Sequence, residues 1–422
     1  MTSVPSLELY IFVIIVTSFI QMIPMLVMAW TVIIAFFGLI KKKEAPAENL
    51  DDFKNGFSIV ICAHNEENSI RSLLDSLRDL DYPREKFHIY VTCDHCTDRT
   101  AQIAATYENT TIYKKTDGDT RGKGDVLSWV IPKILEDSEK TGYEALVFFD
   151  ADNVVKSDFL IHINRMLNMG EDVIQGNRLG GKPYITYITK WYTVYWACFS
   201  TYFSFAREKL GISCFLTGTG WAVKKELLAD SGWNTRSITE DVEYSIQNCI
   251  EGRRVAFCYD AVCYDEQPSD FGVMMNQLSR WTTGAYQILG EYHRMIAESP
   301  KERFVQKLDN IMLLLMGPCS WIAAILSIVN NIIMIWDYMF RDMPLYFFFP
   351  AALFASVSLI FTYIGAYAAV KFNRIPFSKI GLNLLTFPFF VFFYMLCSVK
   401  TCFFPATEWI KVEHRSLDAD QT

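Results

Sequence analysis

Two pairs of acidic residues stand where carboxylates could do chemistry. Asp150 and Asp152 directly follow an apolar stretch, and two carboxylates one residue apart at a strand end can hold a hard divalent cation. Glu240 and Asp241 follow Thr239 in a polar turn, where one acid can act as general base toward a substrate hydroxyl. Each pair also has an ordinary explanation, a solvated loop for the first and a helix cap with favourable charge for the second.

Three further groups could contact a nucleotide base, a phosphate or a sugar. Asp94 ends a second apolar stretch and could accept a hydrogen bond from a base edge, and Lys123 lies in a glycine-containing turn before a predicted helix, where it could meet phosphate. Gln277, Arg280 and Trp281 fall within little more than one helical turn. A guanidinium can grip phosphate and an indole can stack on a sugar face, although the same residues would suit a plain amphipathic helix.

Short apolar stretches alternate with helical patterns in the part of the chain that carries these residues. The patterns predict strands over residues 57–62, 87–92 and 145–149 and helices over 70–80 and 101–105. Such alternation is typical of an α/β domain with a mainly parallel sheet, whose ligands bind beyond the carboxyl ends of the strands. These ends are predicted at His64, Asp94 and Asp150.

Four uncharged hydrophobic runs flank this domain, over residues 9–40, 311–336, 343–370 and 380–399. Each is long enough to cross a membrane, which takes ~20 mostly apolar residues. The predicted organisation is a transmembrane anchor over 1–40, a cytosolic domain over 41–306, a C-terminal transmembrane or interface block over 307–404 and a polar tail over 405–422.

Basic residues set the predicted topology. Residues 41–43 are lysines, and Lys371, Arg374 and Lys379 lie between the third and fourth runs, so the positive-inside rule makes both places and the domain cytoplasmic. Pro388 interrupts the fourth run, and a re-entrant or interfacial segment is an alternative to a full crossing.

Two aromatic stretches are predicted to lie along the membrane interface. They cover residues 184–206 and 271–289, and the first has basic neighbours, as amphipathic interface helices do. An ordinary buried aromatic core is the alternative.

Composition excludes other classes of protein. The chain has 39 basic and 47 acidic residues, a net charge of −8, which argues against a nucleic-acid partner. Its 11 cysteines are scattered along a long chain, so free thiols are expected instead of a disulfide scaffold.

The acidic and basic motifs occur in a fixed order along one domain between hydrophobic runs. They read Asp94, Asp150-x-Asp152, Thr239-Glu240-Asp241 and Gln277-x-x-Arg280-Trp281. This set resembles family 2 membrane glycosyltransferases of the processive polysaccharide synthase type, such as the cellulose, chitin, hyaluronan and poly-N-acetylglucosamine synthases. The resemblance implies a cytosolic GT-A-type α/β domain, with a mixed and mainly parallel sheet, inserted between transmembrane helices.

The resemblance also implies a role for each matched position. Donor binding is implied for His64, Glu66, Asp94, Lys123, Asp150, Gln277 and Arg280. Mg²⁺ or Mn²⁺ binding is implied for Asp150 and Asp152, general-base catalysis for Asp241 with Glu240 beside it, and acceptor stacking for Trp281. The chain departs from the family pattern where His64 replaces a uracil-facing tyrosine and where the acceptor-side run reads Phe215-Leu-Thr-Gly-Thr219.

We therefore predict an inverting, metal-dependent glycosyltransferase at the cell membrane. It would use a UDP-sugar, with UDP-N-acetylglucosamine suggested by the resemblance, to extend a β-linked polysaccharide and pass it through its own spans. The alternative is a single-addition enzyme with a membrane-lipid acceptor, and a third class is a transporter or receptor with an acidic cytosolic domain. Membrane lipids are expected partners, and an accessory export subunit is left open.

Overall fold

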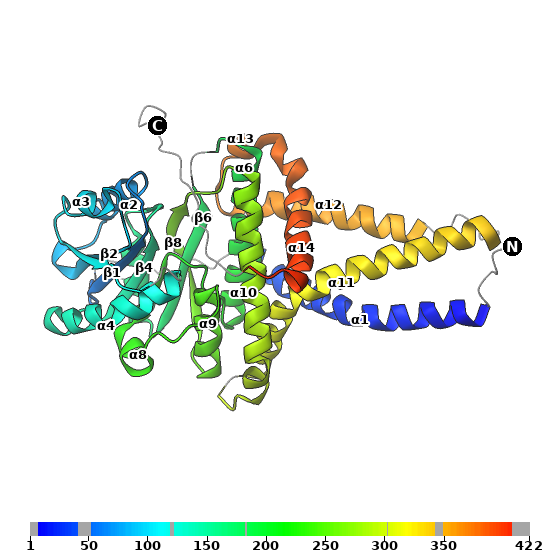
Figure 1. Ribbon diagram of the computed structural model, residues 1–422, viewed down its shortest axis with the longest axis horizontal. Coiled ribbons are helices and arrows are strands. Elements are labelled where there is room, and N and C mark those ends of the chain that lie inside the picture. Colours follow the sequence, from blue (N-terminus) through cyan, green and yellow to red (C-terminus); the bar gives the residue numbers. More distant parts are fainter. Residues whose placement is uncertain are drawn as a thin grey trace.

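A sheet domain at one end of the molecule is joined to long helices that project from the other end (Figure 1). The structure is a computed structural model, and it describes residues 7–40, 52–118, 122–181, 184–301, 303–341 and 349–406. The predicted lysine flank at 41–43 and nearly all of the predicted polar tail, residues 407–422, lie outside the described residues.

The domain is built on one eight-stranded sheet with the strand order β3-β2-β1-β4-β7-β6-β8-β5. Four strands run parallel, β1 (Phe57–Ala63), β2 (Phe87–Asp94), β3 (Thr110–Lys115) and β4 (Ala145–Asp150). The short strand β7 (Trp221–Lys224) is antiparallel to β4 and to β6 (Val173–Gly180). Strand β8 (Val255–Asp265) is parallel to β6 and antiparallel to β5 (Asn153–Val155). The sheet is thus mixed and mainly parallel, as predicted.

Helices cover both faces of the sheet because alternate residues of each strand point to opposite sides. On β1, Ile59 and Ile61 join one hydrophobic core and Val60 joins another. The first core includes residues of α2 (Ile70–Arg78), α3 (Thr100–Ala104) and α5 (Phe159–Asn168). The second includes residues of α4 (Lys123–Thr141), α8 (Lys225–Ser231) and α9 (Glu240–Ile250). Both cores hold the strand ends, and with them the predicted site, in fixed positions.

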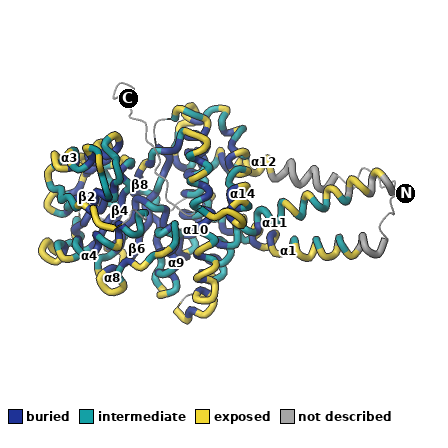
Figure 2. The backbone as a smooth tube through the Cα atoms, viewed as in Figure 1, coloured by how far each residue is buried: buried dark blue, intermediate teal, exposed yellow. Residues whose placement is uncertain are grey.

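Three helices project away from the sheet, α1 (Leu7–Gly38), α11 (Phe304–Arg341) and α12 (Phe349–Phe372) (Figure 1). Much of their described surface is exposed (Figure 2), and it is apolar, with Phe19 72% and Phe361 68% exposed. By length and composition alone, the described segments able to cross a membrane are Ile15–Gly38, Phe304–Ile333 and Asn383–Phe403. The described part of the predicted span 343–370 contributes a shorter apolar helix, Leu359–Phe372.

A layer of crossing helices separates the sheet from the projecting helices (Figure 1). It contains α6 (Tyr187–Cys198), the π-helix η2 (Phe199–Phe205), α10 (Phe271–Glu298) and α14 (Phe387–Phe403). Short segments α13 (Phe377–Ile380) and η4 (Gly381–Thr386) lead into α14. The fourth hydrophobic run therefore packs along α10 and runs across the direction of the projecting helices (Figure 1).

Most rings of the predicted interface segment 184–206 are buried against other protein elements. Trp191, Tyr192 and Trp196 are 5%, 0% and 4% exposed, and they share a hydrophobic core with residues of α10, α12 and α14. These rings thus lie in a buried aromatic core, which is the alternative that the sequence allows for this segment. Tyr187, at the start of α6, is 49% exposed.

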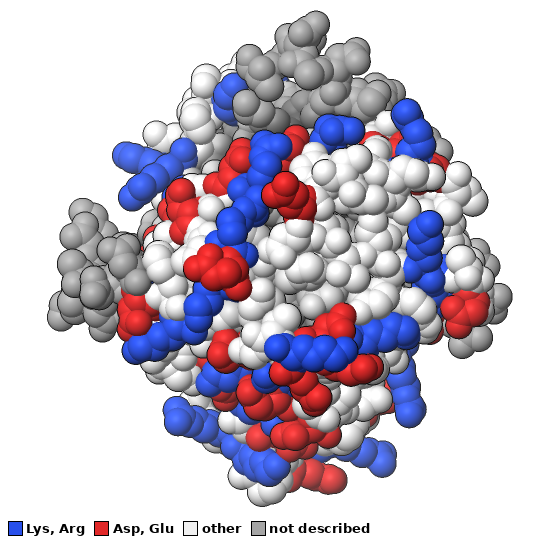
Figure 3. All heavy atoms as spheres, turned by 90° about the vertical axis from the view of Figure 1, so that its left-hand side faces the viewer, with Lys and Arg blue, Asp and Glu red and all other residues white. Residues whose placement is uncertain are grey.

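The opposite end of the molecule has a different surface. Lysine and arginine side chains are interspersed there with aspartate and glutamate (Figure 3). Such mixed charge is typical of a face in contact with water. All 11 cysteines are free thiols, as the sequence predicts.

Candidate active site

One cavity of about 1220 Å³ collects every residue to which the sequence assigns a site role. Its lining includes His64, Glu66, Asp94, Lys123, Asp150, Asp152, Glu240, Asp241, Gln277, Arg280 and Trp281. The cavity exceeds the ~300–1,000 Å³ usual for a single small ligand, so it has room for two substrates.

The carboxyl end of β2 places Asp94 in a dense polar setting. Asp94 is only 3% exposed, and its Oδ1 lies 2.7 Å from His95 Nδ1 and 3.6 Å from Lys115 Nζ. His64 Nδ1 lies 2.7 Å from the Asp94 carbonyl oxygen. His64 and Asp94, which are both predicted to bind the donor, are therefore in direct contact. Lys115, which sequence reasoning missed, ends the neighbouring strand β3, where it faces Asp94 across the ladder.

Lys123 joins the first turn of α4 to the end of β4. Its Nζ donates to Asp150 Oδ1 and, at 2.6 Å, to the carbonyl oxygen of Gly218. Burial opposes the charge of Lys123, but the carboxylates of Asp150 and Glu240 outweigh it and raise the pKa of the ammonium group. Lys123 is thus a fixed cation beside the start of a helix, a setting that favours phosphate.

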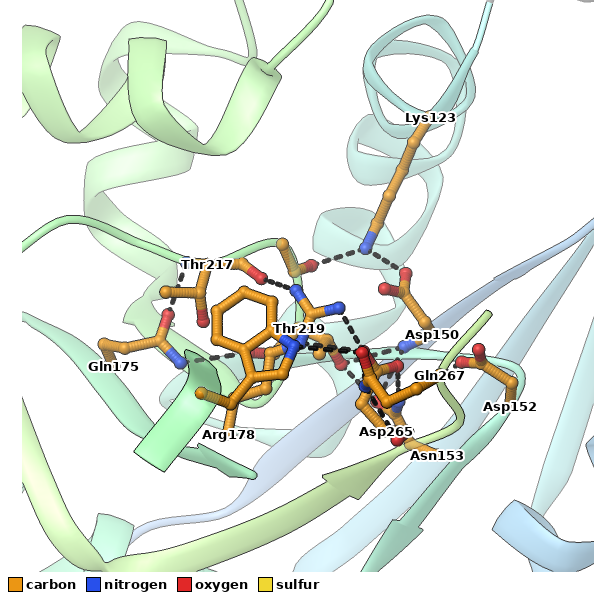
Figure 4. Close-up of polar contacts among 12 residues, drawn as sticks. Lys123, Asp150, Asp152, Asn153, Gln175, Arg178, Thr217, Thr219, Asp265 and Gln267 are labelled. Atoms are coloured by element: carbon orange, nitrogen blue, oxygen red, sulfur yellow. Dashed lines mark hydrogen bonds and ion pairs between the residues drawn. The ribbon is translucent and has the colours of Figure 1, made fainter. Parts of the chain in front are cut away.

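Three carboxylates converge where β4 and β8 end (Figure 4). Ligand oxygens of Asp150, Asp152 and Asp265 lie within 4.8 Å of one another. Asn153 Nδ2 donates to Asp265 Oδ1 at 3.1 Å. An all-carboxylate donor set fits Mg²⁺ or Mn²⁺. Sequence reasoning missed Asp265, although β8 ends on an acid just as β4 does.

Arg178 is a third residue that sequence reasoning missed. Its Nε donates to Asp265 Oδ2 at 2.9 Å, another guanidinium nitrogen donates to the Thr217 carbonyl oxygen, and the group lies 4.1 Å from the ring centroid of Trp196 (Figure 4). Burial opposes the charge, yet Asp265 and Asp150 raise the pKa of Arg178 further. This cation holds Asp265 in place beside the cavity. An isolated arginine inside a strand gives no sequence signal for such a contact.

The first turn of α9 carries the predicted general base. Burial and the charge of Asp241 raise the pKa of Glu240 to about 7, against the opposing effect of Lys123 and Arg280. Burial also raises the pKa of Asp241, although the backbone amide of Val242 works against the rise. Two buried neighbouring carboxylates cannot both ionise freely, so this pair can exchange a proton near neutral pH.

Two glycines allow other helices to approach the first turn of α9. A side chain at Gly284 of α10 would collide with Thr239, and a Cβ at Gly124 of α4 would lie 3.3 Å from Glu240 Cβ. The three helices therefore meet around Glu240 and Asp241. Sequence reasoning missed Gly284, because nothing in the α10 pattern says which residue it faces.

Helix α10 turns the predicted ligand-binding motif toward the cavity. Within the described part of the chain, Arg280 has no hydrogen-bond or ion-pair partner, and Gln277 Oε1 is a buried oxygen without one. Trp281 stacks on Tyr195 at 5.8 Å and meets Trp196 edge-on at 5.6 Å. Arg280 and Gln277 are thus available to a ligand, and Trp281 is held in place by its aromatic neighbours.

Comparison with known proteins identifies the class that this fold and cavity define. The family described as "Glycosyltransferase like family 2" matches residues 55–284, more than half of the chain. The chain belongs to this family. The match begins just before β1 and ends at Gly284, so it covers the whole sheet and α10 as far as its contact with α9.

The relatives of this chain include two kinds of enzyme. A β-monoglucosyldiacylglycerol synthase from Nostoc sp. is 25% identical over 254 residues, which are 57% of this chain and 51% of that protein. This chain thus spans about half the length of that relative. A poly-β-1,6-N-acetyl-D-glucosamine synthase from Staphylococcus epidermidis is 23% identical over 347 residues, 78% of each chain. Homologues therefore include enzymes of lipid and of polysaccharide glycosylation.

A solved structure shares the fold. The mannosyltransferase PcManGT from Pyrobaculum calidifontis, solved in complex with GDP-Man and Mn²⁺, aligns with a TM-score of 0.58 at 17% identity. The alignment covers 91% of this chain and 99% of that one. The GT-A-like mixed sheet predicted from the sequence is confirmed, since the likeness at this level of identity concerns the fold.

Proposed function

We propose that this protein is a membrane-embedded, inverting glycosyltransferase that transfers one sugar from a UDP-sugar to a hydroxyl group. The observation that carries the proposal is the shared cavity, in which Asp241 faces the same space as Lys123, Arg280 and the pair Asp150 and Asp152. A base, two cations and a carboxylate cluster are the groups that this reaction needs in one place.

The proposed reaction is a single displacement. The acceptor hydroxyl oxygen attacks the anomeric carbon as its proton passes to Asp241. The bond from that carbon to the diphosphate breaks, and its electron pair leaves with UDP. Lys123 and Arg280 stabilise the negative charge that develops on the leaving group. One displacement inverts the anomeric configuration, so an α-linked donor gives a β-linked product.

Mg²⁺ or Mn²⁺ is the proposed cofactor, held by Asp150 and Asp152, with Asp265 close enough to join them. When bound, such an ion neutralises diphosphate charge. We propose that His64, Glu66 and Asp94 contact the uridine part of the donor, because all three line the cavity beside the ends of β1 and β2.

We place the enzyme in the cell membrane as a multi-pass protein with a cytoplasmic catalytic domain. The apolar surfaces of α1 and α11 support membrane crossing, and Lys371, Arg374 and Lys379 at the domain side of α12 support a cytoplasmic domain. The crossing direction of α14 supports an interfacial position for the fourth run (Figure 1).

The acceptor is proposed within two classes. A growing polysaccharide built from UDP-N-acetylglucosamine is supported by the Staphylococcus epidermidis relative, whose match covers 78% of both chains. A membrane lipid is supported by the apolar side chains that line the cavity on the side of α11 and α14.

The proposal is tested with the purified full-length chain in lipid vesicles and a panel of UDP-sugars. UDP release that requires Mg²⁺ or Mn²⁺ and one particular UDP-sugar is the expected result. Absence of UDP release with every sugar, together with absence of UDP binding by calorimetry, would contradict the proposed function.

A further inference from the structure

The cavity extends well beyond the groups that would hold a UDP-sugar. Its far side is formed by α1, α11 and α14. We define the apolar lobe as the part of the cavity lined by Met28, Leu313, Met316, Phe390, Val391 and Phe392. The lobe is continuous with the space around Asp241, so its occupant could present a hydroxyl to the proposed base.

The polar groups of Tyr286, Ser398 and Ser320 beside the lobe already have hydrogen-bond partners within the protein. Tyr286 Oη accepts from Trp321 Nε1 at 2.8 Å and pairs with Ser398 Oγ at 3.0 Å. Ser320 Oγ donates to the carbonyl oxygen of Gly317 at 2.7 Å. A sugar chain in the lobe would lose its hydrogen bonds to water with few partners in exchange, which is costly. A hydrocarbon chain makes no hydrogen bonds to water and therefore loses none in the lobe.

The charge of the wall points to a neutral occupant. Among the described residues that line the cavity and belong neither to the donor and base groups nor to the carboxylate cluster with its paired arginine, the charged side chains are Arg207, Glu266 and Lys400. Arg207 is 2% exposed and is neutralised by a two-point ion pair with Asp309. Glu266 and Lys400 carry opposite charges, so the wall offers no net positive charge to an anionic headgroup, and a neutral lipid suits it better.

The rim of the lobe opens among exposed apolar side chains. Met28 is 49%, Val391 51% and Phe392 47% exposed, and all three also line the cavity. In water such a rim would be unfavourable, whereas beside lipid it lets a hydrocarbon chain enter sideways without leaving an apolar medium.

We propose that the apolar lobe binds the hydrocarbon chains of a neutral lipid alcohol whose hydroxyl reaches Asp241. This inference rests on the proposed function and names its acceptor. The lipid oxygen forms the new bond to the anomeric carbon, its proton goes to Asp241, and the bond to UDP breaks with its electron pair on the diphosphate. The products are a one-sugar glycolipid and UDP.

The experiment uses the full-length chain in phosphatidylcholine vesicles with labelled UDP-sugar. One set of vesicles contains dioleoylglycerol and a matched set contains trioleoylglycerol, which has the same chains but no free hydroxyl. We expect label in a one-sugar, organic-soluble product with the first lipid only. At the rim of the lobe, Val391→Trp should raise the apparent KM for dioleoylglycerol by about fivefold or more, because the larger indole takes up space that the lipid chains need. Leu396→Trp, on the same helix and 39% exposed but outside the cavity lining, is the control and should leave that KM unchanged.

Each other outcome decides against the lipid. Label in an organic-insoluble product of many sugars, without a lipid product, would overturn the inference in favour of a polysaccharide. Metal-dependent UDP release that is the same with both lipids would also overturn it, while leaving the proposed glycosyltransferase function intact. Equal KM values for the Val391 and Leu396 variants would show that the chains bind elsewhere.

Discussion

At the scale of single residues, Asp241 is the group on which the chemistry depends. Asp241→Asn keeps the shape of the side chain and removes its ability to accept a proton. We expect sugar transfer to fall by ~10²-fold or more while UDP still binds, because Lys123 and Asp150 are untouched. Product formation and calorimetry measure the two effects. Glu251→Gln is the control at the exposed end of the same helix, and normal turnover by Asp241→Asn would refute the assignment.

The pH profile reports on the same pair of acids. The base Asp241 must be unprotonated, and burial raises its pKa, so kcat should fall as the pH falls through that raised pKa. Burial and the charge of Asp241 raise the pKa of Glu240 to about 7, so Asp241 loses its proton first and Glu240 is still neutral when it does. We therefore expect Glu240→Gln to leave the rising limb of kcat in place, because a neutral amide replaces a neutral acid. A limb that moves in this variant would mean that Glu240, and not Asp241, is the base.

Metal binding depends on residues at two strand ends. Asp152→Asn should abolish turnover, and excess chelator should do the same to the unaltered protein until Mg²⁺ or Mn²⁺ is restored. Asp265→Asn should weaken Mn²⁺ binding, because it removes one of three converging carboxylates. Electron paramagnetic resonance of Mn²⁺ measures that affinity without turnover. Full activity in chelator would rule out the metal.

At the scale of elements, the contact between α9 and α10 is the most specific packing feature of the site. Gly284→Ala would force Thr239 and the first turn of α9 away from α10, at a cost of ~1–3 kcal/mol of stability and with a loss of kcat. Gly290→Ala on the same helix meets nothing within 4 Å, and should be neutral or stabilising by ~0.5–1 kcal/mol because alanine favours the helix. Thermal unfolding in detergent and kcat compare the two variants, and equal behaviour would contradict the packing argument.

The elements also show what the sequence can predict. Local patterns predict strands β1, β2 and β4 and helix α10. The apolar runs that lead to His64, Asp94 and Asp150 indicate both the strand and the end at which a ligand would bind. Arg178 and Asp265 meet only because β6 pairs with β8, and such long-range pairing leaves no local signal. The direction of α14 is likewise set by its packing on α10, not by its hydropathy.

At the scale of the whole molecule, the catalytic domain must keep a fixed position on the helices that project from it. Acceptor binding in the apolar lobe requires this fixed position, because Val391 and Phe392 belong to α14, Met28 belongs to α1, and Asp241 belongs to the domain. A lipid hydroxyl reaches the base only if these parts do not slide past one another. One buried polar cluster connects α7 (Ala206–Leu210), α11 and α1 at the junction.

Arg207 and Asp309 form the centre of this junction. They are 2% and 0% exposed and make two hydrogen bonds of 2.8 and 2.9 Å, and Trp30 Nε1 donates to Asp309 at 2.9 Å. Removing one partner leaves the other charge buried without a counter-ion, so Asp309→Leu should cost ~3–5 kcal/mol of stability. The double variant Arg207→Met with Asp309→Leu removes both charges and should recover most of that loss.

Thermal unfolding of the single and double variants in detergent measures the coupling between the two residues. If the junction also positions the acceptor, the double variant should be stable yet have a raised KM for the acceptor, with the KM for the UDP-sugar unchanged, because the donor groups lie entirely within the domain. A double variant as unstable as the single one would show that packing at the junction, and not the charge pair, fixes the domain on its helices.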